Sequence, residues 1–193
     1  MPRRAKVRPD EPGREKVLSA GIELFGERGY HATSIAEIGL RAGIAKSVLY
    51  HYFGSKAGLW EEVAVAQTRE LIAAVAEAVP DDPDAPRVRA GVDAYLAFLA
   101  GRPAAWRLLL RDPPADRDLL KIHKRLARQR EQALNRLLTR RAKLGHEQPQ
   151  AGLVGTAIRA FAEWWYEHQD VPRERVVDAI MDVAAAAARH VPR

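Results

Sequence analysis

The segment KSVLYHY at residues 46–52 combines side chains suited to binding a polyanion. Lysine neutralises a phosphate, and serine and tyrosine hydroxyls donate hydrogen bonds to phosphate oxygens. Val48 offers an apolar contact to a thymine methyl group, and Lys46 or His51 could reach base edges in a major groove. These residue types predict contacts to duplex DNA rather than covalent chemistry.

Residues that flank this segment extend the predicted surface. Thr33 or Ser34, together with the first amides of a helix that starts there, suits a phosphate because helix N-termini attract anions. Lys56 supplies a further cation. The residues predicted to contact DNA are Thr33, Ser34, Lys46, Ser47, Val48, Tyr50, His51, Tyr52 and Lys56.

Two short helices joined by a glycine turn are predicted to position these side chains. The sequence SIAE at 34–37 fits a capping box and starts the first helix, although Thr33 is an equally good cap. Gly43 permits the left-handed turn that follows. In the second helix Leu49 and Phe53 are expected to face the core, which leaves the polar and aromatic residues outside. The alternative is that LYHYF is only an aromatic core segment.

Residues 33–60, TSIAEIGLRAGIAKSVLYHYFGSKAGLW, resemble the signature of the TetR family of transcriptional regulators without a gap. The pairs Leu24-Phe25 and Gly29-Tyr30 extend the resemblance upstream. It implies an all-helical homodimer in which the residues named above contact operator DNA. It also implies a C-terminal domain that binds a small molecule, and a long helix that follows the DNA-binding domain and transmits the state of the ligand pocket to it.

Three positions depart from the pattern of the family. Gly39 stands where alanine is usual, which should cost about 1 kcal/mol of helix stability. Ala45 replaces a serine-like cap, at a similar expected cost of about 1 kcal/mol. Ser47 replaces a frequent glycine. None of these changes removes a predicted phosphate contact, and they bear mainly on the rigidity of the second helix.

Helical periodicity extends over nearly the whole chain, and strand-like alternation is missing. Glycine and proline breaks predict about nine helices, at 14–28, 34–42, 46–52, 56–78, 87–100, 103–111, 116–144, 150–168 and 173–190. We expect a three-helix DNA-binding domain at 1–55, beginning with a flexible arm at 1–12, and a ligand-binding and dimerisation domain at 56–193. The predicted fold class is all-α.

The net charge is +6, and residues 1–56 hold +4 of it, with ten Lys/Arg against six Asp/Glu. This excess suits a nucleic-acid partner. The chain has no cysteine, which excludes disulfides and thiolate chemistry. Neither a secretory signal nor a membrane span is predicted. Abundant alanine and arginine with little lysine indicate a GC-rich bacterial genome, and we expect a cytoplasmic protein.

The sequence carries no enzyme motif of the common kinds, because G-x-S-x-G, GK[ST] and H-E-x-x-H patterns are all absent. The six histidines are scattered without the spacing of metal ligands. We therefore expect no catalytic residues, no metal site and no cofactor.

Two apolar helices near the C-terminus, at 150–168 and 173–190, predict a dimer interface. The first is apolar around most of its circumference, as expected for a helix buried on more than one side. Two such pairs can form a four-helix bundle across a two-fold axis. The residues predicted in this interface are Val154, Ile158, Trp165, Val176, Ile180 and Val183. The alternative is the core of a monomer.

Large apolar side chains elsewhere in the C-terminal part could wall a pocket for a largely apolar effector. The predicted lining is Tyr95, Phe98, Trp106, Leu109, Leu110, His123, Phe161 and Trp164. Among these, His123 would supply a polar contact. The alternative is that these residues simply fill the core.

The helix predicted at 116–144 is strongly basic between Lys121 and Lys143. A solvated helix face explains such a charge. The sharper hypothesis is a patch for an anionic ligand, such as the phosphates of an acyl-CoA, to which Arg125 and Arg128 contribute.

Together these features predict a repressor that leaves operator DNA when a small molecule enters its C-terminal domain. Bound ligand would favour dimers whose recognition helices are wrongly spaced for half-sites about 34–36 Å apart. An activator is an alternative, because repression depends on where the operator lies relative to the promoter. A DNA-binding protein without a sensor cavity is another.

Overall fold

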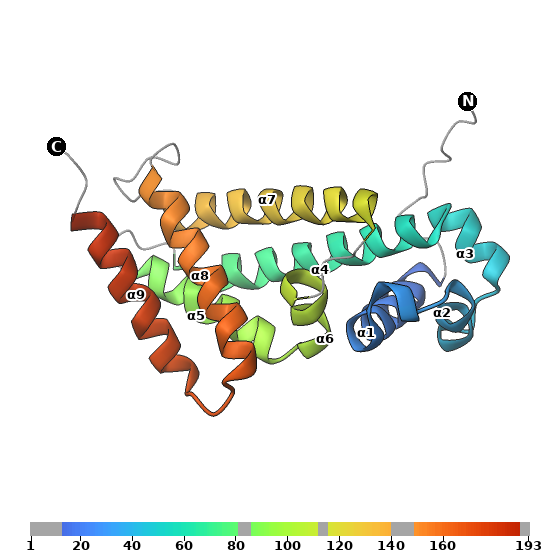
Figure 1. The fold of residues 1–193 in the computed structure, drawn as a ribbon, viewed down its shortest axis with the longest axis horizontal. Coiled ribbons are helices and arrows are strands. Elements are labelled where there is room, and N and C mark those ends of the chain that lie inside the picture. The colour runs from blue at the N-terminus through green and yellow to red at the C-terminus, as the bar shows by residue number, and fades with distance from the viewer. Residues whose placement is uncertain (1–12, 81–85, 112–115, 140–148, 190–193) are drawn as a thin grey trace. The chain divides into compact units, whose positions relative to one another are not determined.

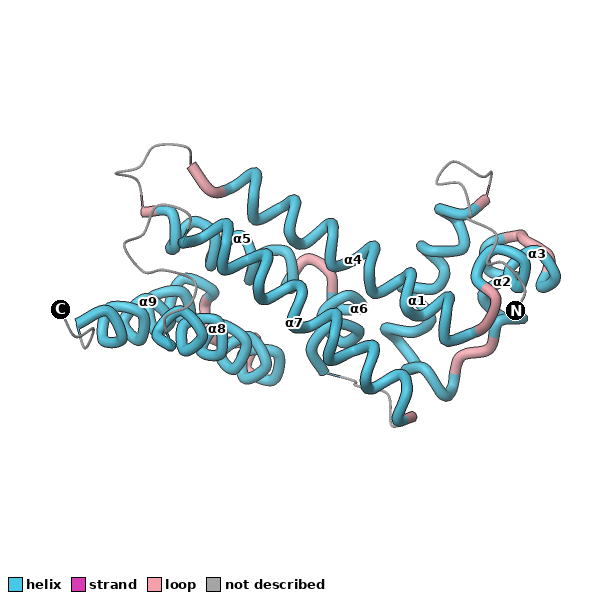
Figure 2. Tube along the Cα trace, turned by 90° about the horizontal axis from the view of Figure 1, so that it is seen from above, coloured by secondary structure: helices cyan, strands magenta, loops and turns pink. Residues whose placement is uncertain are grey.

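The computed structural model describes residues 13–80, 86–111, 116–139 and 149–189. Its helices are α1 (Arg14–Ala32), α2 (Ile35–Ala42), α3 (Lys46–Phe53), α4 (Lys56–Ala78), α5 (Arg87–Ala100), α6 (Pro103–Trp106), α7 (Arg117–Thr139), α8 (Pro149–Glu167) and α9 (Arg173–Arg189), with a π-helical turn η1 (Arg107–Arg111) after α6 (Figure 1). Figure 2 shows only helices and loops in the described ranges. The predicted all-α class and helix number are thus confirmed for this part of the chain. The predicted arm at 1–12 and the helix end at 144 lie outside it.

The chain forms two compact units. The first comprises residues 1–67 and 104–124, and the second comprises residues 68–103 and 125–193. The long helices α4 and α7 therefore each contribute residues to both units. The boundary predicted at residue 55 separates two functions, whereas these two units are defined by packing. That boundary therefore stays a prediction.

In the first unit, α1 packs against α2, and α2 packs against α3 (Figure 1). Their apolar faces share one core with the start of α4, made by Val17, Leu24, Phe25, Ile35, Ile38, Leu49, Phe53, Leu59, Trp60 and Val63. Full burial of a side chain such as Leu49 stabilises the fold by roughly 1.5–3 kcal/mol. The prediction that Leu49 and Phe53 face the core is confirmed.

The turn between α2 and α3 depends on two glycines. Gly43 has a φ of 68°, a conformation that residues with a side chain rarely adopt. At Gly39 an added Cβ atom would lie 2.7 Å from the carbonyl oxygen of Ile44, closer than real contacts allow. The glycine that departs from the family pattern therefore lets this turn approach α2 closely, and the Ile44 amide donates to the Gly39 oxygen at 2.8 Å.

The region predicted as one helix at 103–111 consists of α6 and the π-helical turn η1. Residues of η1 pack on α1. The Arg107 guanidinium donates a hydrogen bond to the carbonyl oxygen of Glu27 at 3.1 Å. This contact ties the segment 104–111 to α1 inside the first unit.

In the second unit, α9 packs against both α8 and α5. Two ion pairs reinforce the contact between α5 and α9: Arg89 with Asp178 at 2.7 Å, and Arg173 with Asp93 at 2.8 Å. All four side chains are partly exposed, so each pair should contribute no more than about 1 kcal/mol. Apolar burial therefore carries most of the stability of this unit.

Candidate DNA-binding surface

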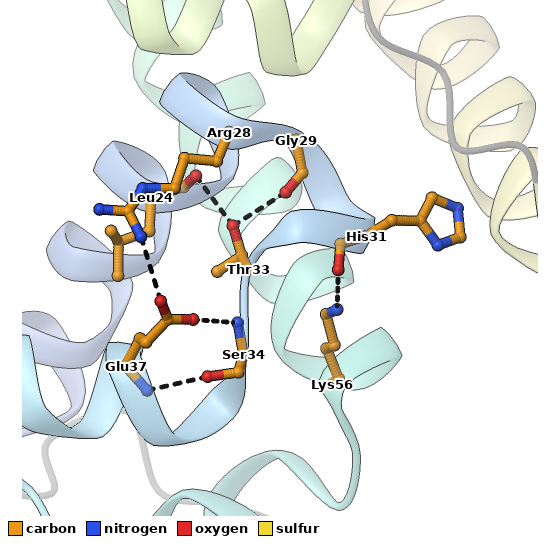
Figure 3. Close-up of polar contacts among 8 residues, drawn as sticks. All are labelled: Leu24, Arg28, Gly29, His31, Thr33, Ser34, Glu37 and Lys56. Atoms are coloured by element: carbon orange, nitrogen blue, oxygen red, sulfur yellow. Dashed lines mark hydrogen bonds and ion pairs between the residues drawn. The ribbon is translucent and has the colours of Figure 1, made fainter.

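The start of α2 is fixed by a reciprocal pair of hydrogen bonds (Figure 3). The Ser34 hydroxyl oxygen accepts from the Glu37 amide at 3.1 Å, and the Glu37 carboxylate accepts from the Ser34 amide at 2.8 Å. This arrangement confirms the capping box predicted from the SIAE sequence. It holds the positive end of the α2 dipole at an exposed position.

Glu37 is also paired with Arg28, whose guanidinium lies 3.1 Å from the carboxylate. The hydrogen bonds from Ser34, with a smaller contribution from Arg28, lower the pKa of the Glu37 carboxyl group. Hydrogen bonds to the charged form favour it over the protonated form. Glu37 is thus a fixed carboxylate that stabilises α2 rather than a proton-transfer group.

Thr33 occupies a different environment from Ser34. Its side chain is 2% exposed, and its hydroxyl lies 3.0 Å from the Leu24 carbonyl oxygen and 2.8 Å from that of Gly29 (Figure 3). A hydroxyl has one proton to donate, and here backbone oxygens receive it. The Thr33 side chain is therefore not available to a phosphate. The sequence left open whether Thr33 or Ser34 contacts a phosphate. The structure favours Ser34, since the buried Thr33 side chain cannot reach DNA.

Lys56, the first residue of α4, reaches back toward the end of α1. Its ammonium group donates to the His31 carbonyl oxygen at 3.4 Å and lies 4.3 Å from the centre of the Tyr30 ring. Partial burial lowers the pKa of Lys56, and the Glu37 carboxylate acts in the opposite direction. The Lys56 ammonium group thus lies close to the start of α2, where it lines the same groove as Ser34.

A groove with a volume of about 330 Å³ adjoins the N-terminus of α2. It is lined by His31, Ala32, Thr33, Ser34, Ile35, Ala36, Lys46, Tyr50 and Lys56. Two lysines, a tyrosine and a helix N-terminus thus converge on one hollow. Such a combination is suited to the negatively charged backbone of a nucleic acid. The sequence predicts a common surface for five of these residues, Thr33, Ser34, Lys46, Tyr50 and Lys56, but it does not predict the groove.

The outward face of α3 carries Lys46, Ser47, Tyr50 and His51, all exposed. Tyr50 is 45% exposed, and the Lys46 ammonium lies 5.7 Å from the centre of its ring. The alternative that LYHYF is merely a core segment is therefore wrong for these residues.

Val48 and Tyr52 on the same helix are half-buried. Tyr52 packs against the core of the first unit, and its ring meets that of Phe53 edge to face at 6.1 Å. Only part of its side chain is thus accessible, and Tyr52 is a weaker candidate for a DNA contact than Tyr50.

The residues predicted to line an effector pocket fall in both units. Tyr95, Phe98, Phe161 and Trp164 belong to the second unit, whereas Trp106, Leu109, Leu110 and His123 belong to the first. All are buried except Phe161 and His123, which are half-buried, and Trp164, which is exposed. The His123 ring lies 6.1 Å from that of Trp60, a residue that the prediction did not include.

Most residues predicted in the dimer interface are covered by helices of the same chain. Ile158, Trp165, Val176 and Ile180 are buried, and the indole nitrogen of Trp165 donates to the Val171 carbonyl oxygen at 2.8 Å. This placement revises the prediction, because side chains buried in one chain cannot also form the surface of contact. Of the predicted set, Val183 is exposed, at 39%, and the Val154 side chain lies outside the described residues.

Trp164 is a large apolar side chain on α8 that is exposed, at 45%. Its indole stacks on the His168 ring with centroids 4.2 Å apart. The prediction had placed Trp164 in a pocket and Trp165 at the surface. In the structure the reverse holds, because Trp164 is exposed and Trp165 is buried.

The basic character of α7 is confirmed over its described length, with one exception. Lys121, Lys124, Arg125 and Arg128 are exposed, but Arg130 is 5% exposed and lies among Tyr95, Glu131, Arg159 and Glu163. Arg130 therefore belongs to the interior of the second unit and not to a basic face. The part of the predicted basic stretch from residue 140 to Lys143 lies outside the described residues.

Within the described ranges, no group of three or more His, Cys, Asp or Glu residues could hold a metal ion. The helices of the same ranges include none that is both long and apolar enough to cross a bilayer.

Comparison with known proteins agrees with the geometry of this surface. Residues 17–63, which span α1 to the start of α4, match the family described as bacterial regulatory proteins, tetR family. The HTH-type transcriptional activator FasR of Mycolicibacterium smegmatis is 27% identical over 98% of this chain and 89% of its own length. The HTH-type transcriptional regulator BetI of Vibrio campbellii is 30% identical over 82% of this chain and 80% of its own.

The same fold occurs in the transcriptional regulator FadR of Bacillus subtilis, solved in complex with stearoyl-CoA. That structure covers 92% of this chain and 99% of its own, with a TM-score of 0.70 at 15% identity. These relatives are transcriptional regulators rather than enzymes. The chain is a DNA-binding transcriptional regulator and belongs to the TetR family.

Proposed function

We propose that the chain is an effector-responsive regulator, most simply a repressor, that leaves operator DNA when a small molecule binds. The observation that carries the DNA-binding half is the convergence of Ser34, Lys46, Tyr50 and Lys56 on the groove at the start of α2. In this proposal residues 1–55 bind DNA and residues 56–193 bind the effector and dimerise. The protein acts in the bacterial cytoplasm, where the chromosome lies.

The proposed contacts divide into those that position the protein and those that specify sequence. Ser34, Tyr50 and Lys56 hold phosphates, because hydroxyls, ammonium groups and helix N-termini are the usual phosphate ligands. Lys46 and His51, on the exposed face of α3, reach base edges, with Ser47 and Val48 beside them. Tyr52 has a minor part because it packs on the core.

Selection of duplexes from a random pool tests this division. Lys46→Ala or His51→Ala should change the selected sequence, because each removes a base-reading side chain. Lys121→Ala is the matched control, since Lys121 is an exposed lysine paired with Asp118 on α7. Recovery of the same sequence by wild type and by both α3 variants would contradict the proposal.

We infer a homodimer formed through α8 and α9. A two-fold axis gives two recognition helices that read two half-sites about 34–36 Å apart. The support is apolar surface left uncovered in the single chain, at Trp164 on α8 and Val183 on α9. Large exposed apolar side chains on two packed helices suit an interface between copies.

As effector we propose a fatty acyl-CoA. The support is the stearoyl-CoA complex of the Bacillus subtilis neighbour, the buried residues Tyr95 and Phe98 on α5, and the half-buried Phe161 on α8. Stearoyl-CoA should release the protein from its selected duplex, whereas CoA without an acyl chain should not. A coupling of about 1–3 kcal/mol would lower DNA affinity roughly 5–150-fold. No change in DNA affinity at saturating stearoyl-CoA would contradict this choice of effector.

An activator is the second candidate, favoured by the likeness to the activator FasR over 98% of this chain. A reporter gene placed behind the selected operator distinguishes the two. Expression that rises when the regulator gene is deleted indicates a repressor, and expression that falls indicates an activator.

A further inference from the structure

Two consecutive residues at the end of α1 hold the ammonium group of Lys56. The Tyr30 ring centre lies 4.3 Å from the lysine nitrogen. The His31 carbonyl oxygen accepts a hydrogen bond from the same nitrogen at 3.4 Å (Figure 3). A lysine side chain on a helix end is ordinarily free to sample many rotamers. Here the face of the Tyr30 ring and the dipole of the His31 carbonyl group both favour one position for the Lys56 ammonium group, at the rim of the groove beside α2.

The Tyr30 ring is itself held in place. It stacks on Phe25 with centroids 6.0 Å apart and meets Trp60 edge to face at 6.5 Å. Phe25 and Trp60 are both fully buried in the core of the first unit. The surface on which the cation lies is therefore an extension of that core.

The path of the backbone also brings Tyr30 and His31 toward Lys56. Gly29 interrupts α1 with a φ of 77° and a ψ of 173°, which redirects the turn that follows. Thr33 closes this turn by donating its buried hydroxyl to the carbonyl oxygens of Leu24 and Gly29. Gly29 and Thr33 thus fix the loop that carries the ring and the carbonyl group.

We propose that Tyr30 is a positioning residue for DNA binding, because it holds the Lys56 ammonium group ready for a phosphate at the N-terminus of α2. The inference rests on the proposed phosphate contact of Lys56. An ammonium group has three donors, and the one hydrogen bond to His31 leaves two for a phosphate. Ordering the side chain before DNA arrives removes part of the entropy cost of binding.

The test compares four variants for binding to random-sequence duplex DNA across a range of salt concentrations. Lys56→Gln should weaken binding and lower the slope of log affinity against log salt by about 0.9, the value of one phosphate contact. Tyr30→Leu removes the π face, and it should weaken binding about 3–10-fold, as preorganisation effects of this size allow. Tyr30→Phe keeps the ring and should bind within about twofold of wild type.

The double variant Tyr30→Leu with Lys56→Gln decides whether Tyr30 acts through Lys56. It should bind no more weakly than Lys56→Gln alone, because the positioned group is already gone. Losses that multiply in the double variant would overturn the inference and show that Tyr30 acts through general packing. If Lys56→Gln changes neither the DNA affinity nor the salt slope, the proposed phosphate contact of Lys56 is refuted. That result is distinguishable from a failure of the inference about Tyr30.

A measurement on the DNA-free protein keeps the inference testable if Tyr30→Leu does not fold. Protons next to the Lys56 nitrogen lie over a ring face, so their NMR signals should be shifted upfield in wild type and in Tyr30→Phe. Signals at the positions of a solvated lysine in both proteins would overturn the inference.

Discussion

Glu37 joins three groups at the start of α2. Its carboxylate accepts from the Ser34 amide, pairs with Arg28, and lies near enough to Lys56 to favour the charged ammonium. The S-x-x-E spacing alone was sufficient to predict the capping box, because the capping contact is local in sequence. Arg28 and Lys56 could not be predicted as its neighbours, since their positions depend on the kink at Gly29 and on the packing of α4.

The pH dependence of stability should show the role of Glu37. Its pKa is lower in the folded protein than in the unfolded chain, so its stabilisation is complete above the ordinary carboxyl pKa. That stabilisation is lost as the pH falls through the lowered value. Glu37→Ala should therefore destabilise the protein in urea unfolding more at about pH 7 than at about pH 3, because below the ordinary carboxyl pKa the unfolded chain binds a proton and part of the stabilisation is lost. A difference that is the same at both pH values would contradict this assignment.

Thr33 is expected to affect stability but not DNA contacts. Thr33→Val removes a buried hydroxyl that serves two backbone oxygens, and it should cost about 1–2 kcal/mol in unfolding free energy. Thr33→Ser, which keeps the hydroxyl, is the matched control and should cost less. Because the side chain is buried, the salt slope of DNA binding should be unchanged in both variants. A lower slope in Thr33→Val alone would show a phosphate contact after all.

At the scale of elements, α3 is short and weakly capped. Ala45 has the extended backbone of an N-cap residue, with φ of −62° and ψ of 140°, but its side chain cannot accept a hydrogen bond from the helix. The predicted departure from a serine-like cap is confirmed. The helix is therefore held mainly by its buried residues Leu49 and Phe53.

A side-chain cap at this position should stabilise α3. Ala45→Ser places a hydroxyl oxygen where it can accept from a first-turn amide, and it should raise the unfolding free energy by about 0.5–1 kcal/mol. Ala45→Val, which adds no acceptor group and is as poor an N-cap residue as alanine, is the control and should gain nothing at this exposed position. Thermal unfolding measures both, and equal effects of serine and valine would contradict the capping explanation.

Helix boundaries were predictable where glycine and proline mark them. The predicted helices at 56–78 and 87–100 coincide with α4 and α5, and most other ends differ by only a few residues. The π-helical turn at Arg107–Arg111 was not predictable, because nothing in RLLLR distinguishes it from an α-helix. Its contacts with α1 come from distant parts of the sequence, which a local pattern cannot reveal.

At the scale of the whole molecule, α8 shows why the prediction assigned Trp164 to the interior and Trp165 to the surface of the chain. The helix is apolar around most of its circumference, so the pattern could not tell which tryptophan faces inward. Trp165 is buried in the second unit, where α8 packs against α9, and its indole nitrogen donates to the Val171 carbonyl oxygen. Trp164 is consequently left outside, where the proposed second copy of the chain would cover it.

The oligomeric state should depend on this exposed apolar surface. Trp164→Glu or Val183→Glu places a charge in the proposed interface, and desolvation of an unpaired charge there should shift the protein toward monomers. Trp164→Phe is the control and should stay dimeric. Sedimentation velocity measures the outcome, and an unaltered dimer in both glutamate variants would place the interface elsewhere.

The central claim is that the exposed face of α3 and the groove at the start of α2 are the surface that binds DNA. Amide hydrogen exchange, measured with and without a duplex selected by the protein, tests this directly. We predict added protection at residues 34–37 and 46–51, with little change along the basic face of α7. Protection concentrated on α7, with α2 and α3 exchanging as in the DNA-free protein, would contradict it.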